Sequence, residues 1–411
     1  MDMKTKMFRM TFYAFAALLV ACTNVEGTYD AVYITEAQSA VEMTLSVDPD
    51  LIVEEPATVS LTISTSVKAD ADVQVGLKLS PELVDSYNSK NSTEYQFAPE
   101  GSFELSSFTA TVAAGKSMSD AVVLTLKDGS KFESGVTYCI PVSIENTSSM
   151  TVLEPSRTVY VIIRTPVVSR AMYLTASNQY IVPGFEFASE YSAMSQVTME
   201  TMIYVKNFRE DGNTISSVMG IEGEFGLRFG DVKIKPDQLQ ICHGNYQPAA
   251  STSLDKGRWY HVAAVYDGAK LSIYVDGAEA GGMAMSGETI NLTSVSSRGF
   301  QMGGSYNDQN GRPLDGYIAE TRVWSRALSA AELKNNMYYL NPEKATGLIA
   351  YWRMNDCESV PAEDFTTYPT LSGSGFRTRA QNVVRDVSGN GYDAYGEKSP
   401  ESVEYLDTKW L

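Results

Sequence analysis

Residues 257–277 read GRWYHVAAVYDGAKLSIYVDG, and their spacing predicts a β-hairpin. Two runs of alternating residues meet at Asp267-Gly268, and the second run ends at Asp276-Gly277. Asp-Gly pairs between such runs are typical of hairpin turns. In the first run both faces carry apolar side chains, so this strand should lie between two layers. In the second run apolar residues alternate with polar ones, which predicts one buried face and one partly wet face. No helical period fits either run, so the segment indicates a β-sandwich.

Three segments, in the same order along the chain, resemble the laminin-G-like domain of the concanavalin A-like lectin/glucanase fold. They are residues 259–263 (WYHVA), residues 314–332 (LDGYIAETRVWSRALSAAE), and residues 347–352 (GLIAYW) with residues 386–391 (DVSGNG). The resemblance implies that residues 167–411 close into two stacked antiparallel sheets. It leaves the ligand open, because this fold includes lectins, hydrolases and adhesion modules.

The preceding part of the chain, residues 40–165, contains about seven short alternating runs separated by turn residues, which predict an immunoglobulin-like sandwich. The segments LVDSYN (83–88), PEG (99–101) and YCIPV (138–142) resemble an N-terminal domain of unknown function on surface lipoproteins of glycan-utilisation systems. Such domains precede glycosidases or binding modules, so the resemblance implies a spacer. Thr165-Pro166 is the expected boundary, because proline ends strand pairing and restricts the residue before it.

The fold class expected for the 411 residues is therefore all-β. An immunoglobulin-like sandwich comes first, and a concanavalin A-like (laminin-G) jelly-roll sandwich follows it. Inside the second domain, Ser329-Ala-Ala-Glu332 has the spacing of a capping box ahead of a helix over residues 333–339. Residues 361–380 are rich in Ser, Thr, Gly and Pro and are expected to form a long loop.

Residues 1–21 combine a basic start with a short apolar run and predict an export signal. The run is too short to span a bilayer. Leu19-Val-Ala-Cys22 resembles a bacterial lipobox, in which the signal is cut before Cys22 and this cysteine takes up lipid; an ordinary signal peptide is the alternative. Residues 22–39 are polar and patternless and are expected to be a tether. The surface-lipoprotein resemblance implies a lipid anchor in the outer membrane, facing the cell exterior.

The net charge and the number of histidines exclude several classes of function. The net charge of −18 argues against nucleic acid as a partner and against membrane contact other than through the lipid. A Ser-His-Asp site needs a histidine, and the chain has only His243 and His261. His261 lies in the hairpin strand, where it is expected to be packed and hydrogen-bonded. His243 stands alone before a turn without the ligand spacing of a zinc site, so the sequence predicts no zinc there.

Glycosidases need a pair of carboxylates, which glucanases of this fold carry in a Glu-x-Asp-x-x-Glu strand. No such run occurs here. Glu222 and Glu224 lie in a glycine-flanked turn, and Glu320 with Arg322 is expected to form a salt bridge. The sequence therefore assigns no catalytic residue.

A polar loop at residues 303–312 (GGSYNDQNGR) is the candidate metal site. Crowded oxygens in a turn suit Ca²⁺, and the corresponding loop of pentraxin-like relatives helps to bind calcium. The resemblance implies Asn307, Asp308 and Asn310 as ligands. A turn held only by its own hydrogen bonds is the alternative.

Two loops carry the mixture of aromatic, amide and charged groups that binds sugars. Their residues are Tyr306, Asn307, Asp308 and Arg312 on one loop, and His243, Asn245 and Tyr246 on the other. The sequence does not decide whether the two loops share a rim. Cys242 and Cys357 are the sole pair that could form a disulfide within one domain.

Together these features predict a cell-surface lipoprotein that binds glycans without cleaving them, as part of a polysaccharide or glycoprotein-glycan utilisation system, and passes them to a neighbouring hydrolase or importer. Two alternatives stay open. One is a glycoside hydrolase with unrecognised acids, and the other is a protein-binding adhesin.

Overall fold

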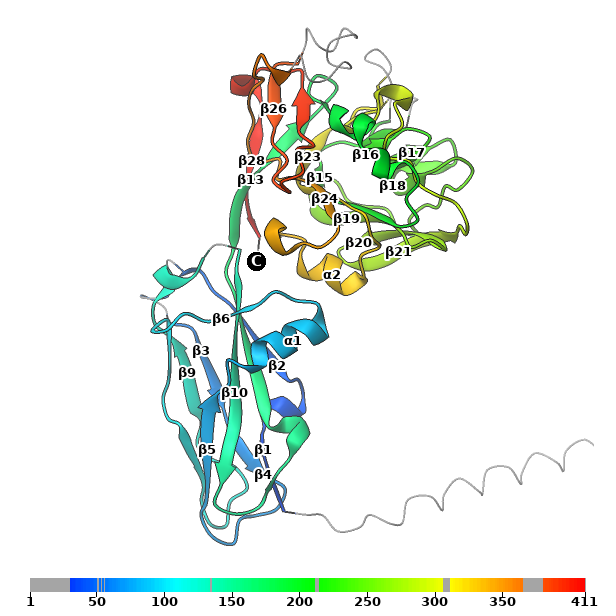
Figure 1. Ribbon diagram of the computed structural model, residues 1–411. Helices are drawn as coiled ribbons and strands as arrows, with labels where there is room; N and C mark the ends of the chain where they lie inside the picture. Colours follow the sequence, from blue (N-terminus) through cyan, green and yellow to red (C-terminus); the bar gives the residue numbers. More distant parts are fainter. Residues whose placement is uncertain are drawn as a thin grey trace, which may run out of the picture.

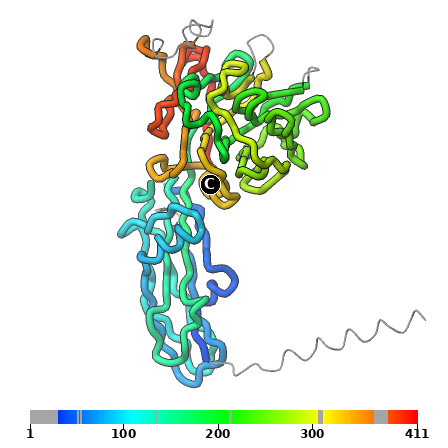
Figure 2. Tube along the Cα trace, turned by 45° about the vertical axis from the view of Figure 1, so that its right-hand side comes forward, coloured from blue at the N-terminus to red at the C-terminus, as the bar shows by residue number. Residues whose placement is uncertain are grey.

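The computed structural model describes residues 30–49, 52, 54, 56–133, 135–210, 214–305, 311–364 and 380–410. These residues form two β-sandwich domains stacked end to end, so the molecule is elongated, as Figure 1 and Figure 2 show from two directions. Thr165-Pro166 lies between the last strand of the first domain and the first strand of the second. The prediction of an all-β chain is confirmed.

The first domain is a sandwich of one large sheet and two small ones. Its strands are β1 (Ala31–Ile34), β2 (Glu42–Ser46), β3 (Thr58–Leu61), β4 (Ile63–Thr65), β5 (Val73–Leu79), β6 (Gln96–Phe97), β7 (Phe103–Leu105), β8 (Thr109–Val112), β9 (Val122–Leu126), β10 (Thr137–Thr147), β11 (Thr151–Val152) and β12 (Thr158–Arg164). The large sheet has the order β2-β12-β10-β5-β8 with β6 beside β10, and the small sheets have the orders β11-β1-β4 and β3-β9-β7. Apolar side chains from all three sheets meet in one core.

Strand β1 lies inside the segment that was expected to be a tether. It pairs with β4 and with β11, and its residues Val32 and Ile34 are buried in the core. The tether prediction is therefore wrong for residues 31–34. The run is only four residues long and finds its parallel partner more than a hundred residues later, so no local pattern reveals it.

The second domain consists of two eight-stranded sheets. Its strands are β13 (Val167–Leu174), β14 (Tyr180–Ile181), β15 (Val197–Val205), β16 (Ser216–Ile221), β17 (Phe225–Asp231), β18 (Ile234–Cys242), β19 (Trp259–Tyr266), β20 (Lys270–Val275), β21 (Ala278–Ala284), β22 (Gln301–Met302), β23 (Gly316–Trp324), β24 (Leu348–Trp352), β25 (Glu358–Ser359), β26 (Asn382–Val384), β27 (Ala394–Gly396) and β28 (Tyr405–Trp410). We call the sheet β21-β20-β19-β15-β23-β13-β28, with β24 beside β23, the back sheet. The front sheet has the order β18-β17-β16-β22-β14-β27-β26-β25. The main core of the molecule fills the space between them.

The hairpin predicted at residues 257–277 is the β19–β20 pair. Val262, Ala264 and Tyr266 face the core between the sheets, and the alternate residues of β19 pack on the outer side against the segment after β23. Strand β19 thus lies between two layers, as predicted. The turn from β20 to β21 consists of Asp276 and Gly277, with φ of 50° and 75°. Positive φ at both residues is what a type I′ turn requires.

Two α-helices, α1 (Leu83–Asn91) and α2 (Ala330–Asn335), face each other across the junction of the domains (Figure 1). Helix α2 begins with the predicted capping box, in which Ser329 and Glu332 each bond the backbone N–H of the other. Its predicted end at Tyr339 is wrong. The helix stops at Asn335 because the chain then turns to present the carbonyl of Asn336 to Arg322, at 2.8 Å.

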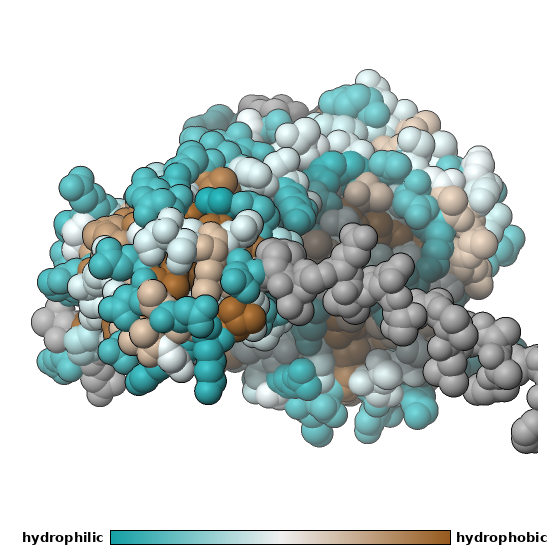
Figure 3. Space-filling view, turned by 90° about the horizontal axis from the view of Figure 1, so that it is seen from below, coloured by the Kyte–Doolittle hydropathy of each residue, from teal (hydrophilic) through white to brown (hydrophobic). Residues whose placement is uncertain are grey.

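The surface is largely hydrophilic where the first domain faces the viewer in Figure 3, with hydrophobic residues in small separated groups. Phe108 and Met118 are examples of such exposed apolar residues in the first domain. Scattered apolar residues of this kind are normal on a globular surface. Among the residues with described structure, no helix has both the length and the apolar character to cross a bilayer.

Candidate functional site

A groove of about 600 Å³ opens at one rim of the second domain, where loops from both sheets meet. We call it the rim groove. Strand β13 starts beside the first domain and ends next to the groove, and its eight residues span roughly 26 Å at about 3.3 Å per residue. The groove therefore lies at the end of the molecule away from the first domain (Figure 1). Its lining residues are Tyr173, Thr175, Ala176, Gln179, Asn207, Phe208, Arg209, Glu210, Ser216, Gly311, Pro313, Leu314 and Asp315.

The groove exists because β13 and β15 end, and β23 begins, at the same end of the back sheet. Gly316 makes their close approach possible at the start of β23. A Cβ added there would lie 2.5 Å from the carbonyl oxygen of Tyr204, so only glycine lets the two backbones pair at this point. The residue before it, Asp315, is thereby placed at the groove.

Asp315 is held by contacts from two other segments. The Tyr173 hydroxyl donates to Asp315 Oδ1 at 2.6 Å, and the Asn207 side-chain amide donates to Asp315 Oδ2 at 2.8 Å. Burial and the hydrogen bond to Asp315 raise the pKa of Tyr173, so this hydroxyl stays protonated at neutral pH. The Lys206 ammonium lies 4.2 Å from the centre of the Tyr173 ring, which is within range of a cation–π interaction.

Phe208 and Arg209 also line the groove, and both are held by contacts with other segments. The Phe208 ring meets Phe229 of the core edge to face, with the ring centres 5.2 Å apart. Arg209 donates to the carbonyl oxygen of Gly311 at 3.1 Å, which ties the loop after β15 to the segment before β23. An aromatic floor with a carboxylate, amides and a guanidinium around it can hold a hydroxyl-rich ligand by stacking and hydrogen bonding.

The predicted polar loop leads directly into this groove. Tyr306, Asn307, Asp308 and Asn310 lie outside the described residues. Gly311, the next residue, lines the groove. The calcium and sugar contacts assigned to the four loop residues therefore stay predictions. In the part of the chain with described structure, no cluster of three His, Cys, Asp or Glu could hold a metal ion.

Arg312 turns away from the rim groove across the outer face of the front sheet. Its guanidinium pairs with Glu222, which also accepts a bond of 3.0 Å from Arg228 and one of 2.9 Å from Ser305. Arg228 is 5% exposed and donates to Gln240 at 2.9 Å. Glu222 thus neutralises two arginines, in keeping with the structural role expected for it.

The second predicted loop lies at the other end of the front sheet. Strands β16 and β18 run the same way, so the turn after Cys242 is remote from Ser216, which lines the rim groove. His243 Nδ1 is paired with the carbonyl oxygen of Glu224, and its ring stacks near Tyr246 with centres 6.3 Å apart. Asn245 is exposed. The structure therefore does not bring His243, Asn245 and Tyr246 to the rim groove.

Sequence reasoning missed most of a buried charge cluster on the outer side of the back sheet. Glu200 lies 2.9 Å from His261 Nε2 and 2.9 Å from Trp324 Nε1, and Arg322 joins it to Glu320. Glu200, His261 and Arg322 are all 0% exposed, so no substrate reaches them. The expected packing of His261 and the expected Glu320–Arg322 salt bridge are confirmed. A lone acid in the middle of the apolar strand β15 was the signal for Glu200.

Environment sets the pKa values in this cluster. Burial alone would raise the pKa of Glu200, but its hydrogen bond with His261 and the charge of Arg322 hold that pKa below its usual value. Burial raises the pKa of Glu320, although Arg322 and the Tyr351 hydroxyl act against it. The guanidinium between the two acids stays charged.

The three described cysteines are free. Cys242 and Cys357, the pair considered from the sequence, therefore form no disulfide. Cys242 is buried beside Gly226, and Cys357 accepts a hydrogen bond of 3.2 Å from the Tyr405 hydroxyl.

Comparison with known families assigns the second domain. Residues 179–334 match the laminin-G family model of the concanavalin A-like lectin/glucanases superfamily, as the sequence predicted. The second domain is therefore a laminin-G-like domain of this superfamily. Residues 27–151 match a further family model described as an N-terminal domain, which covers most of the first sandwich.

Solved structures agree with this assignment. A crystal structure from Bacteroides ovatus, described as that of a candidate carbohydrate binding protein, aligns over 93% of this chain and 99% of its own, with 26% identity and a TM-score of 0.55. The two domains thus occur together in that protein.

Two further structures share less with this chain. Bacteroides thetaiotamicron EndoBT-3987 with a Man5GlcNAc product has 18% identity over 33% of this chain and 30% of its own, at a TM-score of 0.28. A SAP-like pentraxin from Limulus polyphemus has 14% identity over 41% of this chain and 80% of its own, at a TM-score of 0.29. These likenesses are too low to say anything about function. None of the curated proteins matches the chain.

Proposed function

We propose that this protein binds glycans without cleaving them, through the rim groove, as a lipid-anchored component of a glycan-utilisation system at the cell surface. The observation that carries the proposal is the Tyr173–Asp315–Asn207 arrangement, which places an aromatic ring, a carboxylate and an amide around one open groove. The similarity to a candidate carbohydrate binding protein over nearly the whole chain supports it.

The groove suits an oligosaccharide in both size and chemistry. Its volume of about 600 Å³ lies within the range of about 300–1,000 Å³ typical of small-molecule sites. The ordered hydrogen bonds of Asp315 reduce the cost of fixing these groups when a ligand binds. Calcium held by Asn307, Asp308 and Asn310 would add a cation directly beside Gly311, next to the groove.

Surface attachment rests on the sequence. Lipid on Cys22 would hold the protein in the outer membrane, facing the exterior, with the described chain beginning at the end of the first domain remote from the groove (Figure 1). The groove would then point away from the membrane. Fractionation of cells with and without Cys22→Ala tests this point, since the wild type should follow the membrane and the variant should not.

The glycan proposal is tested with a glycan array followed by isothermal titration calorimetry on the best ligand. We expect Asn207→Ala to weaken binding about tenfold through the lost hydrogen bonds, and Tyr173→Ala to weaken it further. Asn207 is exposed, so its variant should fold normally. Each measurement is repeated with EDTA, and loss of binding on chelation would support the calcium site.

Tyr246→Ala is the matched control, because this tyrosine lies at the other end of the front sheet. Its affinity should equal that of the wild type. If Tyr246→Ala weakens glycan binding and Asn207→Ala does not, the binding site lies at the other loop. Silence across plant and host glycans would contradict glycan binding and favour the protein-binding alternative.

One observation favours a second candidate function. Asp315 and Glu210 are two carboxylates lining the same groove, and a glycoside hydrolase needs such a pair. Release of reducing ends from the bound glycan, abolished by both Asp315→Asn and Glu210→Gln, would establish hydrolysis. Binding without release supports the proposal.

A further inference from the structure

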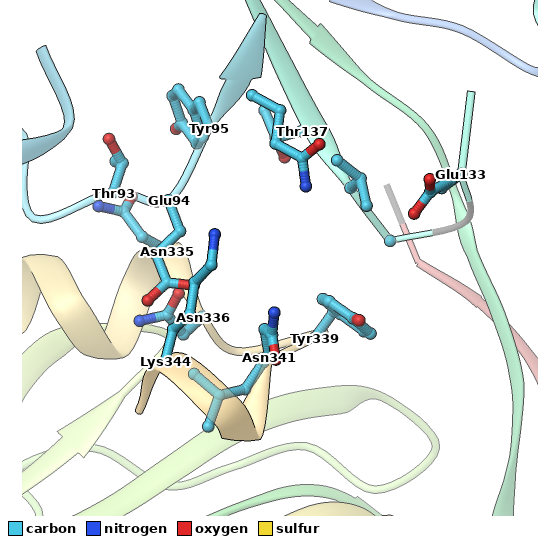
Figure 4. Close-up of a pocket in the computed structure, with 14 residues that line it drawn as sticks. Thr93, Glu94, Tyr95, Glu133, Thr137, Asn335, Asn336, Tyr339, Asn341 and Lys344 are labelled. Atoms are coloured by element: carbon cyan, nitrogen blue, oxygen red, sulfur yellow. The ribbon is translucent and has the colours of Figure 1, made fainter. Parts of the chain in front are cut away.

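A second hollow, of about 130 Å³, lies between the two domains. We call it the junction pocket. Figure 4 shows that side chains of both domains surround it, with Tyr95 and Thr137 from the first domain and Asn336, Tyr339 and Asn341 from the second. The pocket exists only because the domains are stacked, so neither domain alone forms it.

The walls of the junction pocket are positioned by contacts across the boundary. Asn335 donates to the carbonyl oxygen of Asn91 at 3.3 Å, beside the pocket. The Tyr339 ring packs so closely on Gly135 that a Cβ added to that glycine would lie 2.9 Å from the ring. One side of the Tyr339 ring is therefore packed against the first domain.

Two polar groups at this pocket have hydrogen-bonding capacity that the described residues leave unsatisfied. The side-chain amide of Asn336 and the hydroxyl of Tyr339 make no hydrogen bond with any described residue, although the Asn336 carbonyl is bound to Arg322. Both residues are half-buried, which limits the water around them. Amide and phenol groups next to aromatic rings are the chemistry that recognises sugar hydroxyls and sugar faces.

Charge and size restrict the ligand. Glu94 and Glu133 line the pocket against the single base Lys344, so an acidic ligand is disfavoured. A cavity of about 150 Å³ takes up one benzene ring. A hollow of about 130 Å³ that is open to solvent can therefore enclose part of one six-membered ring and leave the rest in solvent.

We propose that the junction pocket binds a single neutral sugar residue, as a second carbohydrate site separate from the rim groove. The two sites lie at opposite ends of the second domain and share no residue. A ligand in the junction pocket touches both domains at once, so its binding also holds them together.

Saturation-transfer NMR on the whole protein tests this with glucose, galactose, mannose and N-acetylglucosamine, and with glucuronic acid as the acidic comparison. We expect signal transfer from at least one neutral sugar and weaker transfer from glucuronic acid. Asn336→Ala removes a side-chain amide that makes no hydrogen bond with any described residue, and it should lower the affinity about tenfold. Tyr339→Phe, which keeps the ring that packs on Gly135, is the second variant and should weaken binding as well.

Asn207→Ala, in the rim groove, is the control and should leave monosaccharide binding at the junction unchanged. The proposal is overturned if no neutral sugar gives transfer, or if Asn336→Ala and Tyr339→Phe both bind like the wild type. Loss of transfer in Asn207→Ala alone would assign the monosaccharide to the rim groove and also overturn it. If no glycan binds on the array but Asn336→Ala weakens monosaccharide binding, glycan binding in the rim groove is refuted and the junction pocket is supported.

Discussion

Two carboxylates of the second domain show how position decides the role of an acid. Asp315 stands where three segments meet, and both of its oxygens are held by side chains that also face an open groove. Glu200 stands in the middle of β15, fully buried and bonded to a histidine and a tryptophan. The first can receive a ligand. The second can only stabilise the fold.

Replacing Glu200 with glutamine should lower the free energy of unfolding by about 3–5 kcal/mol, because it leaves the buried charge of Arg322 poorly compensated. Urea unfolding at pH 7 measures this. Glu279→Gln is the matched control, since Glu279 pairs with Lys270 at an exposed site and should contribute about 1 kcal/mol or less. Equal effects of the two substitutions would contradict the structural role of Glu200.

The same residue predicts a pH dependence. The folded-state pKa of Glu200 lies below its unfolded value of about 4.3. Its contribution is therefore present above about pH 4.3 and is lost as the pH falls through the folded pKa. Below this pH the wild type should lose stability more steeply than Glu200→Gln. The pKa of Glu320 shifts in the opposite direction. Because Arg322 contacts both acids, the difference between the two proteins reports Glu200 together with its effect on Glu320.

Sequence reasoning reached parts of this cluster but not its centre. It placed His261 in a packed strand and paired Glu320 with Arg322. A lone acid in an apolar strand marks Glu200 as unusual, but its partners lie 61 and 122 residues away along the chain, so they could not be identified. The Glu320–Arg322 pair does not follow from strand alternation alone. Glu320 has a φ of 52° in a bulge, so simple alternation does not put it beside Arg322.

At the level of single elements, local chemistry predicts where elements begin better than where they end. The Asp-Gly turns of β19–β21 and the capping box of α2 each depend on residues that are close together in the sequence, and both are confirmed. The end of α2 depends on Arg322, which comes from another strand, so the helix was predicted four residues too long. The rim groove was missed for the same reason, because its three loops are far apart in sequence.

Ser329→Ala should destabilise the second domain by about 1 kcal/mol, since it removes the hydrogen bond to the backbone of Glu332. Thermal unfolding followed by circular dichroism measures the change. Ser399→Ala is the comparison, because Ser399 precedes a short 3-10 helix and its hydroxyl bonds the Ser402 hydroxyl instead of a backbone N–H. An unchanged melting temperature for Ser329→Ala would show that packing of Leu333, and not the cap, holds α2.

For the whole molecule, the fold of each domain could be predicted and their arrangement could not. The residues that make the junction come from the loops and ends of elements. Lys409 of the second domain pairs with Asp48 of the first at 2.5 Å, and Gly135 packs on Tyr339. No pattern within either domain marks these residues as neighbours.

Gly135→Ala should loosen the stacking of the domains, because the added methyl group meets the Tyr339 ring. Small-angle X-ray scattering should then report a broader distribution of distances than in the wild type. Gly115→Ala is the matched control, since Gly115 has the same φ of 78° but nothing within 4 Å of the added carbon. Overlapping scattering curves for all three proteins would contradict a stacking held by this contact.

The run from β12 to β13 has a mechanical consequence. The two strands are separated only by Thr165 and Pro166 and pass from one domain into the other as an almost continuous extended segment (Figure 1). Strand β12 is bonded to β10 and β2, and β13 to β28 and β23. Tension between the distal rim and the far end of the first domain therefore runs lengthwise along these strands and shears many hydrogen bonds together. This arrangement should resist unfolding when the two ends of the molecule are pulled apart.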